Sequence, residues 1–352
     1  MMSTFRPLDL MAEHVREAAS ERGIKTSIVG GPGRDPDRER PWLAFTINGI
    51  DYIYANGALF ERDPNCSTVE WRHINHAATL LMADKHRFKD YLTSQGFETP
   101  AGMVFRRRKL EEARAAFDKF TPPLCVKPNN GSEGKCVFTD LRDRTYFDAA
   151  LNEVAKCYQN IVVEQSVVGT HFRFFYIAPN ITAIRMGRQA IVFGDGFRSI
   201  QGLIDEINSE RRRRALPTHP PLIVTQQIRD YLAMQNLTLD SIPLRGQEVR
   251  LAGTSNATAG ADSLIVEEGV VHRSYIARAV AACRTIPGLH ISGLDLVIAD
   301  PSRPANKENM WFLEFNASPA ILAFYYPWEG PVVDIAGRIL DYLAERDPTM
   351  LS

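Results

Sequence analysis

The stretch from Trp311 to Pro319, with the sequence WFLEFNASP, constrains the fold more than any other part of the chain. Side chains alternate between the two faces of a β-strand, so Glu314 and Asn316 point the same way. Their apolar neighbours predict that the opposite face of this strand is buried. The sequence therefore predicts a strand that ends at a proline and presents a carboxylate and an amide together.

Carboxylate and amide oxygens are the hard ligands that suit Mg²⁺, which also keeps substrate phosphates in its coordination shell. Asp295 lies in a second apolar run, Gly293–Ile298, and is a candidate third ligand from a neighbouring strand. The alternative is that Glu314 pairs with a basic residue and Asn316 caps the following turn, which is the more common role for an isolated E-x-N.

The segment Leu124–Phe138 is predicted to form a strand, a glycine-bearing loop and a second strand. Lys127 ends the first strand, where its ammonium could meet phosphate, and glycines let backbone N–H groups surround phosphate oxygens. The spacing matches neither the P-loop nor the dinucleotide fingerprint. Taken alone, the loop is more often an ordinary turn between strands.

Two further segments are informative only in combination with those described above. A helix is predicted from Ala83 through Gln95, ending at Gly96, and it contains Lys85. An apolar strand, 161–164, ends at Glu164 and leads through a polar link to a glycine. Taken separately, Lys85 would be a solvated helix residue and Glu164 an exposed strand end.

In this order, Lys85, Lys127 with its glycine loop, Glu164, Asp295 and Glu314-x-Asn316 resemble the ATP-grasp carboxylate–amine ligases. The likeness is strongest to the glutathione-synthetase half of the bifunctional bacterial glutathione synthases and to the ATP-grasp module of cyanophycin synthetases. It covers roughly residues 76 to 345. The other stretches that carry it are Gly169–Phe175, Val192–Ile200, Val249–Leu251, Ser255–Ser263, Asn316–Ile321 and Tyr326–Gly330.

The resemblance implies an α/β fold, the ATP-grasp fold with an N-terminal α/β lobe. The expected division is an N-terminal lobe over 1–100, a small ATP-grasp lobe over 101–168 and a large lobe with the metal site over 169–352. Helices are expected near 109–118, 145–158, 199–210, 225–235, 274–284 and 331–345, and strands near 124–127, 136–139 and 161–164.

The resemblance also implies a function: an ATP-dependent ligase that joins a carboxylate to an amine through an acyl phosphate and releases ADP and phosphate. Its cofactors would be ATP and Mg²⁺, with two ions that Mn²⁺ can replace. Asp295, Glu314 and Asn316 would hold the metal. The nucleotide would contact Lys85, Lys127, Gly131, Ser132, Glu133, Gly134, Glu164, Gln165, Ser166, Val167 and His171.

Arginines would orient the carboxylate substrate and stabilise the tetrahedral intermediate, because a guanidinium forms paired hydrogen bonds with carboxylate or phosphate. The candidates are Arg250, Arg173 and Arg185, and for Arg250 a surface role is equally consistent with its strand-like surroundings. The substrate contacts would be Asn256, Thr258 and Ser318.

Some positions depart from the family pattern. His171 stands where the family has an acidic residue that contacts the ribose, so no carboxylate makes that contact here. The small-residue loop has Ala259-Gly260-Ala261 in place of a glycine pair, and an arginine run at 211–214 follows the predicted helix. We therefore expect an acceptor or donor other than that of glutathione synthesis.

The net charge is −1 and the pI is about 6.7, which argues against a polyanion-binding protein. The arginine run falls at a helix C-terminus, where the helix dipole favours cations, and is predicted to be solvated. No apolar stretch is long enough to span a bilayer, and the start lacks the plan of a signal peptide. We expect a cytoplasmic protein, without nucleic-acid or membrane partners, that acts on amino acids or small peptides, with a homodimer expected by resemblance.

Other functions use the same residues. A kinase that phosphorylates a small metabolite needs the same lysines and metal ligands. A ligase that adds amino acids to a polypeptide tail is a variant of the main hypothesis. A nucleotide-binding regulator without turnover is disfavoured, because it need not keep Asp295, Glu314 and Asn316 together.

Overall fold

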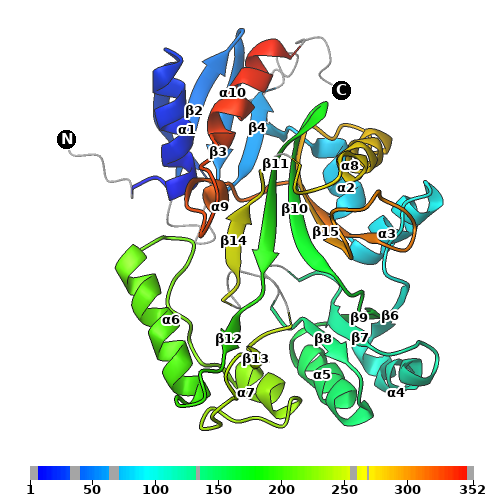
Figure 1. Cartoon of the computed structure of the whole chain (residues 1–352). Helices are drawn as coiled ribbons and strands as arrows, with labels where there is room; N and C mark the ends of the chain where they lie inside the picture. Colours follow the sequence, from blue (N-terminus) through cyan, green and yellow to red (C-terminus); the bar gives the residue numbers. More distant parts are fainter. Residues whose placement is uncertain are drawn as a thin grey trace.

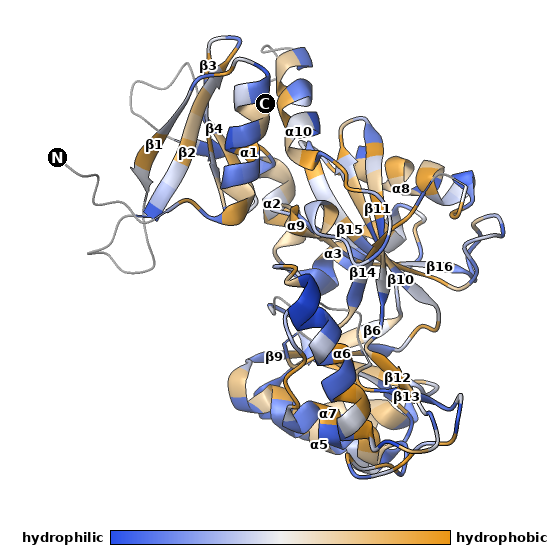
Figure 2. Ribbon diagram, turned by 60° about the vertical axis from the view of Figure 1, so that its left-hand side comes forward, coloured by the Kyte–Doolittle hydropathy of each residue, from blue (hydrophilic) through white to orange (hydrophobic). Residues whose placement is uncertain are grey.

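The computed structural model describes residues 7–31, 40–62, 71–131, 135–253, 260–267 and 269–346. Figure 1 shows three successive parts: an N-terminal sheet with helices α1 (Leu10–Glu21) and α10 (Ile335–Glu345), a central sheet, and a lower group of short strands and helices. Figure 2 shows the same three parts from another side.

The N-terminal sheet is an antiparallel meander of five strands in chain order. Two of its hairpins turn at Asn48-Gly49 and Asn56-Gly57, and all four residues have φ between 50° and 82°. Asn-Gly adopts these left-handed conformations with little strain and so fixes tight two-residue hairpins. The strands are β1 (Thr26–Gly31), β2 (Arg40–Ile47), β3 (Ile50–Ala55), β4 (Ala58–Arg62) and β5 (Trp71–His73).

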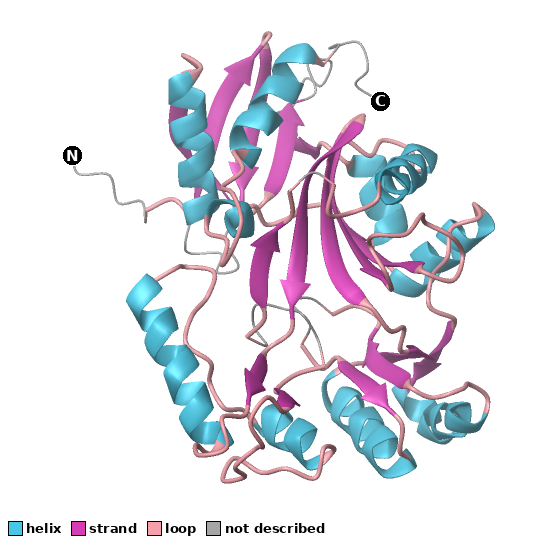
Figure 3. Ribbon diagram, in the orientation of Figure 1, coloured by secondary structure: helices cyan, strands magenta, loops and turns pink. Residues whose placement is uncertain are grey.

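The central sheet is antiparallel, in the order β14-β11-β10-β15-β16. Its back face carries the alternate apolar residues, such as Phe172, Phe174 and Leu294, which share a core with residues of helices α2, α3 and α8. Figure 3 shows these helices grouped at one side of the sheet. The elements are β10 (Thr170–Ile177), β11 (Asn180–Arg188), β14 (Asp262–Ile265), β15 (Ile291–Ile298), β16 (Met310–Asn316), α2 (His76–Met82), α3 (Lys85–Ser94) and α8 (Arg273–Thr285).

The front face of the central sheet changes character along its strands. At one end Phe175, Ile177 and Ile291 join the apolar core that α1, α10 and the N-terminal sheet complete. Toward the other end the same face carries Arg173 and Asp295, which are paired in the strand register. The period of two therefore places an apolar lobe contact and a polar surface on one face.

The lower group contains a four-stranded sheet in the order β6-β9-β7-β8, one face of which packs against helices α4 and α5. Beside it lie the two antiparallel strands β12 and β13, with helices α6 and α7 between them in the chain. The elements are β6 (Gly102–Arg106), β7 (Leu124–Pro128), β8 (Phe138–Leu141), β9 (Asn160–Gln165), β12 (Ile191–Phe193), β13 (Glu248–Arg250), α4 (Leu110–Arg114), α5 (Arg144–Cys157), α6 (Ile200–Arg214) and α7 (Gln226–Ala233), with 3₁₀ turns at Arg107–Lys109 and Ala115–Asp118. The short helix α9 (Leu322–Tyr325) instead joins the core of α1 and α10.

The predicted helices and strands form, with small shifts. The second strand of the hairpin begins at Phe138 rather than 136, and the helix predicted near 109–118 is a short α-helix followed by a 3₁₀ turn. The arginine run differs at one position, since Arg211 is 3% exposed and donates to Gly260 O and the Asp262 carboxylate. The helix places it on the inner side of α6, whereas 212–214 are exposed. No helix in the described ranges is long and apolar enough to cross a membrane.

The packing crosses the expected lobe boundaries in two places. Residues of α2 and α3, assigned to the N-terminal lobe, share the core behind the central sheet. The last helix, α10, returns to pack with α1, and Arg22 forms an ion pair with Asp341 at 2.7 Å. We keep the division at 100 and 168 as a proposal, supported by each large sheet being drawn from one of the three segments.

Asn75 joins the N-terminal part to the central sheet. It is fully buried, and its amide donates to Ile291 O (2.7 Å) and Ala317 O (2.9 Å). Its carbonyl oxygen accepts from the backbone N–H groups of His290 (2.8 Å) and Ile291 (3.1 Å). One side chain thus satisfies four backbone groups at the start of β15 and just after β16.

Replacing Asn75 by Ala should lower the free energy of unfolding by about 3 kcal/mol or more, because buried backbone groups lose their partners. Urea unfolding of the full chain measures this difference. Asn180→Ala, at the exposed first residue of β11, is the matched control and should change stability by less than about 0.5 kcal/mol. Equal stability of the Asn75→Ala variant and the wild type would contradict the proposed linking role.

Candidate functional site

The first half of the site is one face of the four-stranded sheet. In the register of β7 and β9, Cys125 lies opposite Glu164 and Lys127 opposite Val162, so Lys127 and Glu164 share a face. The other face, with Leu124 and Val126, belongs to the core that α5 covers. Alternation along two neighbouring strands therefore places a lysine and a glutamate on the side away from the helices.

Glu164 is 3% exposed and accepts from two lysines, at 2.7 Å from Lys127 Nζ and 2.6 Å from Lys89 Nζ. Burial alone would raise the pKa of Glu164, but the two ammonium groups lower it to about 2. Burial lowers the pKa of Lys89 to about 8, and the attraction of Glu164 only partly offsets this. One carboxylate and two lysines leave the cluster with an excess positive charge.

Lys89 was not predicted as a site residue. It follows Lys85 by four positions, so both side chains leave the same face of α3. Lys85 forms an ion pair with Glu314 on the central sheet, while Lys89 reaches Glu164 on the smaller sheet. The i, i+4 spacing was visible in the sequence, but only the tertiary structure shows that α3 contacts both sheets.

The second half of the site is the polar end of the central sheet. Arg173, Asp295 and Glu314 are opposite one another on β10, β15 and β16. Arg173 binds Asp295 through two hydrogen bonds, Nε–Oδ1 at 2.8 Å and Nη2–Oδ2 at 2.5 Å. The structure thus brings together the predicted ligands Asp295 and Glu314, and Asn316 lies two residues along the same face.

The alternative roles of the E-x-N motif are also present. Glu314 pairs with Lys85, and Asn316 Oδ1 accepts from Ser318 N–H at 3.1 Å. In both arrangements, side-chain oxygens of the proposed metal ligands already accept hydrogen bonds from other groups of the protein. The ion pairs do not conflict with ligand binding, because a metal or phosphate can compete for these groups.

Arg185 lies beside Arg173 in the register of β10 and β11. Its Nη1 donates to Ser263 Oγ at 3.1 Å, and within the described residues it has no carboxylate within salt-bridge distance. Burial, with a contribution from Arg173, lowers the pKa of Arg185 to about 10. A cation held here without a direct counter-ion favours an anionic ligand.

The charges of the whole site point the same way. Five cationic side chains accompany three carboxylates, so the site carries an excess of positive charge at neutral pH. Such an arrangement suits a polyanion such as a nucleoside triphosphate. The cations are Lys85, Lys89, Lys127, Arg173 and Arg185, and the carboxylates are Glu164, Asp295 and Glu314.

The link between the two sheets contains the predicted adenine contacts Gln165, Ser166 and Val167. Gln165 N–H donates to Ala101 O at 2.9 Å and Ser166 N–H to Pro123 O at 2.8 Å, so the start of the link is fixed. His171 follows on β10, and burial lowers its pKa, which favours the neutral imidazole. A neutral ring cannot replace the charge of a carboxylate at this position.

Other predicted site residues are less closely grouped. Arg250 lies on β13, is exposed, and pairs with Glu248 at 3.0 Å. Gly131 begins the loop after β7, where a Cβ atom would come within 2.5 Å of Pro128 Cγ. Ser318 lies in the turn after β16, with its Oγ 3.1 Å from His73 Nε2. The predicted residues Ser132, Glu133, Gly134, Asn256 and Thr258 lie outside the described residues.

The donor set can be tested for its fit to Mg²⁺. Asp295, Glu314 and Asn316 offer oxygen atoms from one face of two adjacent strands, which is the chemistry that Mg²⁺ requires. The described residues contain no group of three His, Cys, Asp or Glu side chains placed to hold a metal by themselves. Two carboxylates and an amide fit an ion that completes its shell with phosphate oxygens and water.

The sequence is similar to known biosynthetic enzymes, although no protein-family model matches it. It is 30% identical over 339 residues to the glutathione biosynthesis bifunctional protein GshAB of Pasteurella multocida, covering 94% of this chain and 42% of that protein. It is 29% identical over 269 residues to cyanophycin synthetase of Trichormus variabilis, covering 75% of this chain and 29% of that protein. The chain therefore spans less than half the length of these relatives.

A solved structure supports the fold. The bifunctional glutathione synthetase from Pasteurella multocida superposes with a TM-score of 0.61 at 24% identity, covering 97% of this chain and 45% of that one. Almost all of the present chain thus follows part of one larger known structure.

Lys89 leads to a prediction on pH. Its pKa of about 8 in the folded protein lies below the ordinary 10.5, so the unfolded chain binds more protons between these values. Burial of the charged Lys89 lowers the free energy of unfolding, and this cost disappears as the pH rises from 8 to 10.5. The free energy of unfolding should therefore rise by up to about 1.4 kcal/mol per pH unit over this range. In the Lys89→Met variant, the free energy of unfolding should not show this rise with pH.

Urea unfolding of the wild type and the Lys89→Met variant at several pH values from 7.5 to 10 measures the difference. Lys156→Met, at an exposed helix position, is the matched control and should follow the wild type. Parallel curves for the wild type and Lys89→Met would show that Lys89 titrates like a solvated lysine.

Proposed function

Because the chain has the ATP-grasp fold and is similar to glutathione and cyanophycin synthetases, we propose that it is an ATP-dependent carboxylate–amine ligase. It would form an amide bond between amino acids or small peptides and release ADP and phosphate. The observation that carries this proposal is the pair of facing polar surfaces, one with the Lys89–Glu164–Lys127 cluster and one with Arg173, Asp295 and Glu314.

The chemistry explains why ATP is needed. A carboxylate cannot lose oxide, so an oxygen of the substrate carboxylate first attacks the γ-phosphorus and ADP leaves. The amine nitrogen then attacks the acyl carbon, the C–O bond to phosphate breaks, and the amine proton is lost to solvent or to phosphate. The protein contributes mainly positioning and charge neutralisation.

The lysines would serve the nucleotide. Lys127 and Lys85 leave the two sides of the site, where each can meet phosphate oxygens as a point charge. The excess positive charge of the Glu164 cluster would then be matched by the triphosphate. The link at 165–167 would offer backbone groups to adenine, and the loop at 131–134 would close over the phosphates.

Mg²⁺ bound by Asp295, Glu314 and Asn316 would neutralise phosphate charge during transfer. Arg173 now pairs with Asp295 and Lys85 with Glu314. To bind Mg²⁺, these carboxylates would have to give up the two ion pairs or bind the ion and the basic side chain together. Two ions, with Mn²⁺ as a substitute, are the fuller form of this proposal. Both are proposed from the resemblance.

The arginines would serve the carboxylate substrate and the tetrahedral intermediate. Arg173 and Arg185 lie side by side on neighbouring strands, which suits paired binding of one anion. Arg250 would join them from β13, with its bond to Glu248 exchanged for a ligand. The substrate contacts proposed for Asn256 and Thr258 rest on the resemblance.

The proposal also includes the substrates, the cellular location and the oligomeric state. Small amino acids or peptides would be its substrates, and a cytoplasmic homodimer its working form. The departures at His171 and in the 259–261 loop favour a donor or acceptor other than that of glutathione synthesis.

A direct assay tests the reaction. The purified chain is incubated with Mg²⁺, ATP and pooled amino acids and γ-glutamyl dipeptides, and both ADP and new masses are followed. A product lighter by one water than its two substrates supports the ligase. A product that gains a phosphoryl group would identify a kinase, and repeated mass additions to a polypeptide would identify a tail ligase.

A substitution tests the metal assignment. Glu314→Ala and Glu314→Gln should each lower turnover by about a thousandfold, because the site loses a metal ligand. Glu308→Ala, at an exposed position just before the same strand, should stay within about twofold of the wild type. Near wild-type turnover of both Glu314 variants would remove Glu314 from the metal site.

A further inference from the structure

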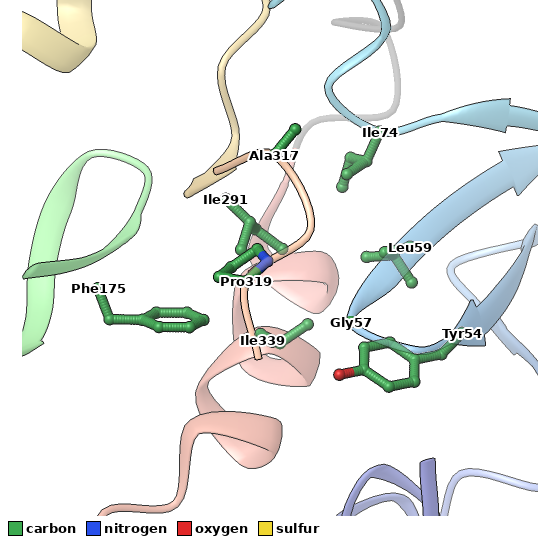
Figure 4. Close-up of a pocket in the computed structure, with 9 residues that line it drawn as sticks. All are labelled: Tyr54, Gly57, Leu59, Ile74, Phe175, Ile291, Ala317, Pro319 and Ile339. Atoms are coloured by element: carbon green, nitrogen blue, oxygen red, sulfur yellow. The ribbon is translucent and has the colours of Figure 1, made fainter. Parts of the chain in front are cut away.

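The turn that follows β16 is held by the N-terminal sheet. Figure 4 shows Ala317 and Pro319 among apolar residues from both parts, in a small pocket that Phe175 and Ile291 line from one side and Leu59 and Ile74 from the other. At Gly57 a Cβ atom would lie 3.0 Å from the carbonyl oxygens of Ser318 and Pro319. The hairpin of β3 and β4 therefore fits closely against this turn.

Two hydrogen bonds fix the turn on either side of Ser318. Asn75 donates its side-chain amide to Ala317 O, and Ser318 N–H donates to Asn316 Oδ1 at 3.1 Å. Asn316 is one of the proposed metal ligands. The backbone of Ser318 is thus anchored to the N-terminal part on one side and to the candidate metal site on the other.

The hydroxyl of Ser318 contacts His73, on β5. Asn75 N–H donates to His73 Nδ1 at 3.0 Å, so this nitrogen carries no proton. In the neutral ring the proton is then on Nε2, which lies 3.1 Å from Ser318 Oγ and donates to it. Burial lowers the pKa of His73 to about 4, in agreement with a neutral ring.

The direction of this bond determines what Ser318 can do. Its oxygen accepts from His73, so its own O–H is left to donate, and no described residue accepts that hydrogen bond. The turn also approaches a candidate catalytic arginine. A Cβ atom at Gly293 would lie 3.0 Å from Pro319 Cβ and 3.4 Å from Arg173 Cδ. The side chains of Pro319 and Arg173 therefore both occupy the space above Gly293, which has no side chain of its own.

We propose that His73 is a positioning residue that holds the Ser318 hydroxyl as a hydrogen-bond donor for the carboxylate of an amino-acid substrate. Arg173 lies near Pro319, the residue after Ser318, and a hydroxyl together with a guanidinium suits a carboxylate because the ligand accepts from both. This inference rests on the proposed function and deepens it. It gives the N-terminal sheet a role in substrate binding, through one hydrogen bond to the turn.

Two substitutions separate the contacts of His73. His73→Asn places a polar atom near the former Nδ1 and keeps a partner for Asn75 N–H, but it cannot reach Ser318. His73→Gln places an amide N–H near the former Nε2 and keeps the donor to Ser318. If His73 only supports the fold, the two variants should not differ in ligand binding.

The binding test uses calorimetry with the full chain. The probes are Mg·ADP, and then, in its presence, each of the twenty amino acids, γ-glutamyl dipeptides and the matching carboxamides. His73→Asn and Ser318→Ala should each weaken binding of the preferred amino acid about tenfold, and the double variant should be no weaker. His73→Gln and the exposed control His76→Phe should stay within about threefold. The matching carboxamides accept only a neutral hydrogen bond from Ser318, so they should lose less affinity in His73→Asn and Ser318→Ala than the amino acid does.

A second readout does not depend on substrate. Nitrogen NMR of the labelled chain, with the His73 signal assigned by its loss in His73→Gln, should show a protonated Nε2 and an unprotonated Nδ1. The opposite tautomer, or equal weakening by His73→Asn and His73→Gln, would overturn the inference. So would Mg·ADP binding with no carboxylate-dependent amino-acid binding, whereas loss of Mg·ADP binding in the wild type would overturn the proposed function on which it rests.

Discussion

The buried contact of Glu164 with Lys89 and Lys127 is the interaction on which the rest of the site depends. A carboxylate at 3% exposure is stable only because two ammonium groups meet it, and each lysine comes from a different element. Lys127 belongs to the same sheet, but Lys89 comes from α3, whose other side packs behind the central sheet. The cluster therefore sets both the charge of the site and the position of one sheet against the other.

Much of the fold followed from local patterns. Alternation predicted the shared face of Glu314 and Asn316. Apolar runs predicted the strand ending at Glu164 and, with a glycine-bearing loop, the hairpin that carries Lys127. The proposed ligation chemistry was indicated by the order of several motifs rather than by any one of them. The structure adds that Asp295 and Glu314 are directly opposite in register, which no single segment could predict.

The residues that sequence reasoning missed depend on long-range contacts. Lys89 was not predicted to be a site residue, and Arg211 was predicted to be part of a solvated helix end, because the sequence does not show which side of each helix meets the rest of the protein. His73 and Asn75 lie outside the segment that carries the family resemblance, or at its edge. Their importance comes from contacts with Ser318 and Ala317, about 240 positions later in the chain.

Helix α3 has a mechanical consequence. One turn of this helix holds Lys85 on the central sheet and Lys89 on the smaller sheet, and the helix body is packed behind the central sheet. If the sheets separate to admit a nucleotide, the helix can follow only the sheet on which it is packed. Separation of the two sheets must then stretch the contact of Lys89 with Glu164. The energy of this buried ion pair would therefore contribute to the activation barrier for nucleotide exchange.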